Sequence, residues 1–427
     1  MENTVTQNPV FKNIKGFIED KEKKALMEKC YNAIRTEGER DFDRSLPTLA
    51  PSDFDAYFPL VSAVIFTANK FECDTLNYLV SNQNGGTVHK RRDKIHIFGN
   101  NDIHSPVAYI LKVSSSYILH LLANETGSYT PGGSSDLVRY ISGNSALRPS
   151  CIISFGICYG RNPNKQMIGD VIIPRKLYPW SIGQKVVEEE LQIKHDNFNL
   201  WLEDKFAENN IYSSIAMYCN DDEGRIIEKS IRIKNEEIKF KIKVSYGNMS
   251  TGEAVVSSKI LKDKIVVANR NEKEIGGEME GYGLAKECVY YAKIPCVILK
   301  SICDWGELKN IEKAFEEEGV NYPENLKDKL QAYASFCAGL ALLDLFLEDG
   351  DKLLTLSIIN WLKEKCICNE YHYASEEKIK DGIKEFFACE TDFDFIFDNL
   401  LQLNKLIKVE KDYNKTIVYC TERRRNA

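Results

Sequence analysis

The stretch GGEMEGYGLAKECVYYAKIPCVILKSICD, residues 276–304, contains the pattern that decides the fold. Its apolar residues from Gly281 to Lys293 are spaced as on one side of a helix. A mostly apolar run from Ile294 to Ile302 follows, which is typical of a strand buried on both faces of a sheet. Helix and buried strand in succession are the repeating unit of an α/β domain.

Similar apolar runs occur earlier in the chain, and each is short and bounded by polar residues. They cover residues 60–67, 107–113, 117–122, 150–155 and 170–174. A second long helical pattern covers residues 326–347, and an alternating pattern over residues 227–245 predicts an antiparallel hairpin. Buried strands that alternate with helices predict an α/β domain with a mixed central sheet flanked by helices.

The two ends of the chain differ from this central part. Residues 11–40 have apolar positions three or four apart among many charges, which predicts an amphipathic helical arm that packs on a neighbour. Residues 41–59 contain three prolines and are interpreted as a linker. The first 58 residues are therefore predicted to be an arm and linker that precede the α/β domain over residues 59–349.

The pattern changes again after residue 350. Three helical segments, over residues 353–366, 375–388 and 392–406, precede two short strands over residues 407–411 and 416–421. Three helices followed by a hairpin are the order of elements in a winged helix. We therefore predict a small α+β, winged-helix-like domain over residues 350–427.

Composition and charge exclude several classes of protein. The 427 residues are 43% hydrophobic and 28% charged, which is ordinary for a globular protein. A net charge of -7 argues against a protein that coats nucleic acids without specificity. The 13 cysteines are scattered through apolar segments, so we interpret them as reduced, buried thiols and predict no metal site. With no signal-peptide pattern and no run of about 18 apolar residues, the expected location is cytoplasmic.

Four loops at the ends of predicted strands contain residues that suggest a binding site. Ligands of open α/β sheets bind at the carboxyl ends of the strands. The loops in question are Ala68 to Glu72, Gly156 to Gly160, Gly276 to Gly283, and Cys303 to Trp305. Their acidic, glycine and aromatic residues make them the candidates for catalysis.

Taken in this order, the segments resemble the purine nucleoside phosphorylase superfamily, and most closely its methylthioadenosine/adenosylhomocysteine nucleosidase branch. The most specific marks are Glu278-Met279-Glu280 at a helix start and Ser301-Ile302-Cys303-Asp304 at a strand end. Phe155-Gly156, the start of the strand at Gly169-Asp170-Val171, and STGEAV at residues 250–255 support them. The resemblance implies an N-glycosidase without a cofactor that acts on a purine nucleoside or nucleotide, with adenine the favoured base.

The resemblance also implies roles for individual residues. Asp304 would supply the proton that the purine's imidazole-side nitrogen receives as the base leaves, if burial raises the pKa of its carboxyl. Glu280 would accept hydrogen bonds from the two vicinal ribose hydroxyls, while Met279 packs on the sugar. Without the resemblance, Asp304 would be a loop-capping residue and Glu280 a first-turn glutamate that favours the helix dipole.

Glu72 follows Ala68 at the spacing of the carboxylate that activates the attacking water in nucleosidases of this branch. Phosphorylases have a Gly-Asp-Pro-x-Arg type of loop here, and its absence favours hydrolysis over phosphorolysis. The Gly- and Ser-rich residues 126–135 precede a helix and are a candidate anion cradle. The resemblance assigns the remaining substrate contacts to Gly156, Glu253, Ala254, Val255 and Trp305, with Tyr246 a second candidate for an aromatic contact.

Partners and alternatives follow from the same patterns. The resemblance implies a homo-oligomer formed through the α/β domain. Asp392, Asp394 and Asp398 make the third helical segment of the last domain acidic, so a protein partner is favoured there over DNA. The domain order resembles nucleotide-depleting effectors of bacterial anti-phage defence. Two alternatives stay open: a phosphate-dependent purine nucleoside phosphorylase, and a DNA-binding regulator that uses the α/β domain as a nucleoside sensor.

Overall fold

A computed structural model describes most of the chain before residue 348 and three segments after it. The described residues are 5–36, 40–82, 85–97, 105–113, 116–123, 127–147, 149–181, 185–187, 190–192, 198–207, 212, 215–216, 219, 224–253, 256–268, 274–308, 310–347, 375–386, 406–411 and 416–421.

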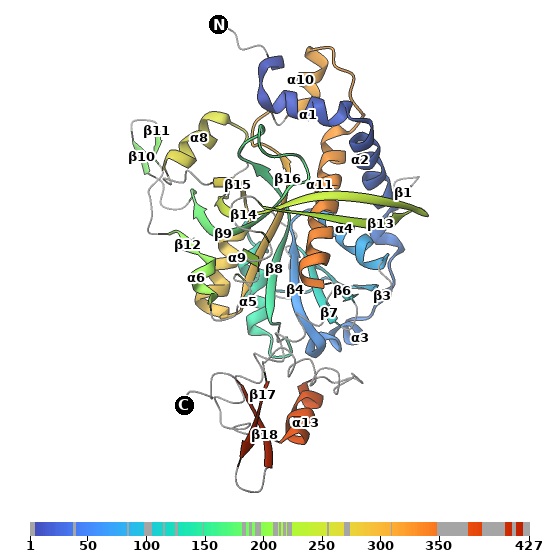
Figure 1. Ribbon diagram of the computed structural model, residues 1–427, viewed down its shortest axis with the longest axis vertical. Helices are drawn as coiled ribbons and strands as arrows, with labels where there is room; N and C mark the ends of the chain where they lie inside the picture. Colours follow the sequence, from blue (N-terminus) through green and yellow to red (C-terminus); the bar gives the residue numbers. More distant parts are fainter. Residues whose placement is uncertain are drawn as a thin grey trace.

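One mixed sheet of 12 strands forms the centre of the molecule (Figure 1). The strands are β3 (Thr48–Leu49), β4 (Val61–Thr67), β5 (Thr87–Arg91), β6 (Val107–Val113), β7 (Ser116–Leu122), β8 (Cys151–Gly160), β9 (Val171–Pro179), β12 (Leu200–Trp201), β13 (Arg225–Ile233), β14 (Glu236–Thr251), β15 (Glu274–Glu278) and β16 (Cys296–Asp304). Their order is β12-β9-β14-β15-β8-β4-β7-β6-β5-β3, with β13 paired to β14 and β16 paired to both β8 and β9. The predicted mixed α/β class is confirmed.

Parallel pairing in the middle of the sheet brings the predicted loops together. β8 runs parallel to both β4 and β16, so the chain leaves these three strands at the same edge. All seven residues of β4 are buried because helices cover both faces of the sheet, which explains its apolar run. The second half of β14 runs parallel to β9 and β15, so its end at Thr251 lies near the same edge.

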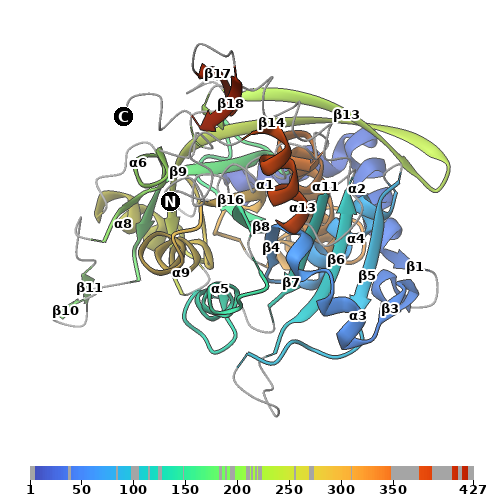
Figure 2. The same ribbon diagram turned by 90° about the horizontal axis from the view of Figure 1, so that it is seen from below.

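Helices pack on both faces of the sheet (Figures 1 and 2). α2, α4 and α11 contact one another on one face, and α5 contacts α9 on the other. The helices are α1 (Pro9–Glu19), α2 (Lys21–Ile34), α3 (Pro51–Asp55), α4 (Lys70–Ser81), α5 (Ser134–Gly143), α6 (Leu202–Lys205), α8 (Lys259–Ala268), α9 (Gly281–Glu287), α10 (Ile311–Glu317), α11 (Leu326–Leu342) and α13 (Glu376–Phe386). A π-helical turn follows both α9 and α11, so the two predicted helices continue in a wider winding.

The N-terminal arm is a pair of helices that packs on the α/β domain of its own chain. Asp20 ends α1, and its side chain accepts hydrogen bonds from the first turn of α2. The ring of Phe11 meets that of Phe315 with 4.8 Å between centroids, and Phe17 meets Tyr333 at 5.2 Å. The arm therefore covers α10 and α11 of its own α/β domain.

The predicted linker, residues 41–59, contains short elements that contact the central sheet. β3 pairs in parallel with β5 at the edge of the sheet. Asp43 accepts a hydrogen bond of 2.7 Å from the hydroxyl of Tyr109 on β6. One of its prolines, Pro51, is the first residue of the short helix α3.

The hairpin predicted over residues 227–245 is formed by β13 and β14. Its turn residues, Lys234 and Asn235, have φ of 46° and 69°, which suits the right-handed twist of the paired strands.

Short elements complete the described part. β1 (Arg35–Thr36) pairs with β2 (Arg40–Asp41), and β10 (Lys185–Val187) pairs with β11 (Glu190–Gln192). After residue 374, α13 and the antiparallel pair of β17 (Leu406–Lys411) and β18 (Thr416–Thr421) agree with the predicted second helix and hairpin. The helices predicted over residues 353–366 and 392–406 lie outside the described residues, so the winged-helix-like domain stays a prediction. Among the described residues, no helix is long and apolar enough to cross a membrane.

Candidate active site

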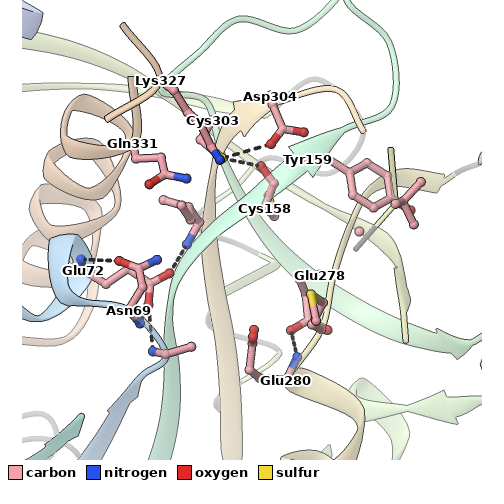
Figure 3. Close-up of a pocket in the computed structure, with 15 residues that line it drawn as sticks. Asn69, Glu72, Cys158, Tyr159, Glu278, Glu280, Cys303, Asp304, Lys327 and Gln331 are labelled. Atoms are coloured by element: carbon pink, nitrogen blue, oxygen red, sulfur yellow. Dashed lines mark hydrogen bonds between the residues drawn. The ribbon is translucent and has the colours of Figure 1, made fainter. Parts of the chain in front are cut away.

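A pocket of about 250 Å³ opens where β4, β8 and β16 end (Figure 3). It brings together Glu72, Met279, Glu280 and Asp304, which are four of the predicted site residues. Figure 3 shows Asp304 at the opposite end of the pocket from Glu280, with Glu72 beside the first turn of α4. The pocket is therefore elongated between two acidic ends.

Backbone hydrogen bonds fix the carboxylate of Glu72. Its Oε2 accepts from the N–H groups of Ala68 at 2.8 Å and Asn69 at 3.1 Å. Asn69 in turn accepts from the N–H of Glu72, so the two side chains form a capping box at the start of α4. Oε1 accepts from the N–H of Ile157 on β8 at 2.9 Å. Glu72 is thus buried and held in one orientation, with lone pairs left to accept a further hydrogen bond.

Gly156 makes this position of Glu72 possible. A Cβ atom added at Gly156 would lie 2.2 Å from Oε1 of Glu72, which is far inside van der Waals contact. The predicted substrate contact at Gly156 is therefore a close approach of β8 to the Glu72 carboxylate. Gly156 itself does not line the pocket, but it contacts Glu72, which does.

A buried lysine that the sequence reasoning missed joins the acidic residues. Lys300 on β16 is 1% exposed, and its Nζ lies 3.0 Å from Oε2 of Glu280. Burial would lower the pKa of the Lys300 ammonium, but the negative charges of Glu280, Glu72 and Glu278 raise it above the ordinary value. Lys300 therefore stays charged. A single lysine inside the apolar run of residues 294–302 was the available signal.

Glu280 is the last residue before α9, and its backbone is held as firmly as its side chain. Its carbonyl oxygen accepts hydrogen bonds from Ser128 Oγ at 2.9 Å and Ser134 Oγ at 2.7 Å. The ion pair with Lys300 is made by Oε2 of the carboxylate, and Glu280 lines the pocket. The neighbouring Met279 supplies an apolar side chain to the same wall.

Glu278, at the end of β15, is a second residue that the sequence reasoning did not assign. Its Oε2 accepts from the N–H groups of Glu280 at 2.8 Å and Gly281 at 2.7 Å, which anchors the start of α9. Burial, reinforced by the charge of Glu280 and opposed by Lys300, raises the pKa of its carboxyl to about 7. Burial likewise raises the pKa of Glu72, an effect opposed by Lys300.

Asp304 ends β16 at the other end of the pocket. Its Oδ1 accepts a hydrogen bond of 2.6 Å from the N–H of Gly306, and its Oδ2 lies 3.5 Å from Sγ of Cys303. Gly306 has φ of 65°, a left-handed conformation that favours glycine and lets the chain turn back under the carboxyl. One oxygen of Asp304 is thereby fixed by the backbone.

The aromatic wall near Asp304 differs from the predicted one. Trp305 is fully buried in the main core and does not line the pocket. Tyr246 is also in the core, with its hydroxyl 3.4 Å from Glu203. Tyr159, from the end of β8, lines the pocket instead and packs with Trp180 and Val256 in a separate apolar cluster. Because the chain turns at Gly306, the side chain after Asp304 faces inward.

Glu253 contacts the loop that was predicted to be an anion cradle. Its carboxylate accepts hydrogen bonds from the N–H groups of Ser128 at 3.1 Å and Tyr129 at 3.2 Å. The loop is attached to the pocket wall, since Ser128 Oγ also donates to the carbonyl oxygen of Met279 at 3.1 Å. These two N–H groups thus already bind an anion of the chain itself. Ala254 and Val255 lie outside the described residues.

No protein-family model matches the chain, and no curated protein matches it in sequence. Solved structures do match. Nucleosidases are among the solved structures that it resembles. One is the 5′-methylthioadenosine/S-adenosylhomocysteine nucleosidase from Neisseria meningitidis in complex with methylthio-immucillin-A. It is 16% identical over 65% of this chain and 97% of its own, with a TM-score of 0.39.

Two further structures that match are a futalosine hydrolase and a second nucleosidase. The futalosine hydrolase of Helicobacter pylori strain 26695 is 14% identical over 66% of this chain and 97% of its own, with a TM-score of 0.38. The 5′-methylthioadenosine/S-adenosylhomocysteine nucleosidase from Colwellia psychrerythraea 34H, in complex with adenine, is 14% identical over 66% and 95%, with a TM-score of 0.38.

Proposed function

We propose that the chain is a purine N-glycosidase, which hydrolyses a purine nucleoside or nucleotide to free base and sugar. The observation that carries the proposal is the arrangement of three acidic residues in one pocket, with Asp304 at one end and Glu280 and Glu72 near Lys300 at the other. Cleaving the bond from C1′ of the sugar to N9 of the purine requires help for the departing base and for the sugar cation that forms.

Asp304 acts on the base in this proposal. As the C1′–N9 bond breaks, its electron pair moves into the purine, and the Asp304 carboxyl acts as the general acid that gives a proton to N7. The base then leaves as a neutral molecule. The N–H of Gly306 holds Oδ1 of the carboxyl, and Asp304 lines the pocket in which the base would bind.

Glu280 and Lys300 act on the sugar. The Glu280 carboxylate accepts hydrogen bonds from the 2′ and 3′ hydroxyls, and its ion pair with Lys300 holds it in place. The ribose ring is thereby oriented with C1′ toward Glu72. The negative charge at this end of the pocket also favours the cationic sugar of the transition state.

Glu72 activates water. Water adds to C1′ and loses a proton to the Glu72 carboxylate, so the products are the free base and the free sugar. The three backbone hydrogen bonds to Glu72 hold its carboxylate in position before the substrate binds. Because burial raises the pKa of Glu72, its carboxylate accepts a proton more readily than an exposed glutamate would.

Hydrolysis is favoured over the phosphorolytic alternative by the contacts of Glu253. A phosphate nucleophile needs an anion site beside the sugar, and the N–H groups of Ser128 and Tyr129 donate to the Glu253 carboxylate. Adenine as the favoured base, a nucleotide-depleting role in phage defence, a homo-oligomer and a protein partner for the last domain stay predictions.

The test is incubation of the purified protein with a panel of purine nucleosides and nucleotides, with and without inorganic phosphate. We expect free base and free sugar in phosphate-free buffer, with no increase in rate when phosphate is added. Release of sugar 1-phosphate that depends on phosphate would show a phosphorylase. The absence of base release from every purine substrate would contradict the proposal and favour the nucleoside-sensor alternative.

A further inference from the structure

A second, smaller cavity continues from the pocket beyond Asp304. It has a volume of about 30 Å³ and shares four lining residues with the pocket: Cys303, Asp304, Lys327 and Gln331. Glu72, Met279 and Glu280 do not line it. The cavity therefore lies at the Asp304 end of the pocket, away from the residues assigned to the sugar.

The wall of this cavity is mostly apolar and includes the N-terminal arm. Ile14 of α1, Leu308, Ile311 of α10 and Leu330 of α11 line it. The arm is a fixed part of this wall, because Asn13 Nδ2 donates to the carbonyl oxygens of Pro163 at 2.6 Å and Gln166 at 3.0 Å. Asp304, Glu307, Lys327 and Gln331 supply the polar groups of the wall, and Lys327 is exposed.

The loop that separates the cavity from the core is held by a buried lysine. Lys262 Nζ donates to the carbonyl oxygen of Trp305 at 2.7 Å and to Oε1 of Glu307 at 2.9 Å. This ion pair compensates the charge of Glu307, which lines the cavity together with Asp304. Leu308 has φ of 50°, a left-handed conformation that is uncommon for a residue with a side chain and persists where its surroundings impose it. The loop therefore has one imposed shape, with Leu308 at the cavity.

We propose that this cavity is a subsite for a small apolar substituent on C6 of the purine, such as the methyl group of an N6-methyladenine nucleoside. The inference rests on the proposed function, which places N7 of the purine at Asp304 and the sugar at Glu280. The C6 substituent lies on the same edge of the purine as N7, so it points past Asp304 into the cavity. A space of 30 Å³ holds roughly two water-sized groups, which matches a methyl or ethyl substituent.

The test compares adenosine with N6-methyladenosine in the parent and in two variants of Ile14. Ile14→Phe fills the cavity from the arm, and Ile14→Ala enlarges it. We expect the parent to cleave N6-methyladenosine with a kcat/KM at least equal to that for adenosine. Ile14→Phe is expected to lower kcat/KM for N6-methyladenosine by about 10-fold or more, with a change below about threefold for adenosine. Ile14→Ala is expected to raise kcat/KM for adenosines with larger N6-alkyl groups.

Ile18→Ala is the matched control, because Ile18 is buried on the same helix and does not line the cavity. It is expected to lower thermal stability without changing the ratio of the two kcat/KM values. The subsite proposal would be overturned if Ile14→Phe changed kcat/KM equally for both substrates. It would also be overturned if the parent did not cleave N6-methyladenosine.

Calorimetric binding of adenine and N6-methyladenine separates failure of the subsite from failure of the proposed function. If adenine binds and is released from adenosine while N6-methyladenine does not bind, only the subsite is wrong. If neither base binds and no purine nucleoside is cleaved, the proposed function is wrong, and the subsite with it.

Discussion

Lys300 Nζ lies 3.0 Å from the carboxylate of Glu280, and this ion pair is buried at the point where the sugar is proposed to bind. The pair links two strand ends, since Lys300 belongs to β16 and Glu280 follows β15. Glu72 and Glu278 add two more carboxyl groups whose charges act on the same ammonium. One cation thus compensates a cluster of acidic side chains, which makes it important for both folding and chemistry.

Replacing Lys300 with methionine is expected to destabilise the protein strongly. The change leaves buried carboxylates without their cation, which typically costs about 3–5 kcal/mol in the free energy of unfolding. Lys300→Arg retains the charge and is expected to lose less. Urea unfolding followed by circular dichroism measures both. A methionine variant as stable as the parent would mean that the carboxyl groups are compensated in another way.

Glu280→Ala is expected to weaken both substrate binding and rate, with a larger loss for ribose than for deoxyribose substrates. A hydrogen bond to a charged group contributes about 1.5–3 kcal/mol, which corresponds to roughly 10-fold to 150-fold in kcat/KM. The measurement is kcat/KM for adenosine and 2′-deoxyadenosine in the parent and the variant. An identical response of the two sugars would exclude Glu280 as the ligand of the 2′ hydroxyl.

Gly156→Ala is expected to abolish activity because the new methyl group would displace the Glu72 carboxylate from its hydrogen bonds. The matched control is Gly16→Ala, since nothing lies within 4 Å of a Cβ added at Gly16 on α1. That change is expected to stabilise the protein by about 0.5–1 kcal/mol, because alanine favours helices over glycine. Base release measures the effect of Gly156→Ala on activity, and thermal melting measures the effect of Gly16→Ala on stability. Full activity in Gly156→Ala would show that the position of Glu72 is unimportant.

Glu278→Gln is expected to change how stability depends on pH. The pKa of Glu278 is raised to about 7 in the folded protein against an ordinary 4.5. The folded state therefore binds more protons than the unfolded state between these values, and its stability falls as pH rises through this window. The glutamine variant lacks this contribution. We expect the melting temperature of the parent, relative to that of the variant, to decrease from pH 4.5 to 7 and then to level off.

The same difference in melting temperature at pH 4.5 and pH 8 would contradict the raised pKa of Glu278. Glu274→Gln is a useful companion, because burial also raises the pKa of Glu274 to about 7. Glu274 does not line the pocket. Its variant is therefore expected to show the same pH effect on stability with little effect on base release.

Much of the fold follows from patterns that the sequence displays. Strands with both faces covered favour apolar residues on both faces, so β4 and β6 are visible as mostly apolar runs. Parallel strands then end at one edge of the sheet. Residues far apart in sequence, such as Glu72 and Asp304, meet there for that reason.

Other features depend on packing that no local pattern contains. Trp305 faces the core because the chain turns at Gly306, and Tyr159 takes the place in the pocket wall that this leaves. The sequence pattern shows that the N-terminal arm has an apolar face. It does not show that this face packs on α10 and α11 of the same chain. The role of Lys300 depends on three carboxyl groups from two different parts of the chain.

The measurement that tests the central claim most directly is release of free purine by the parent and by Asp304→Asn in phosphate-free buffer. Asparagine has the shape of aspartate but cannot donate the carboxyl proton to N7, and loss of a general acid costs about 100-fold to 10,000-fold in rate. We predict a loss in this range with an unchanged melting temperature. Equal rates of base release from the parent and from Asp304→Asn would contradict the claim.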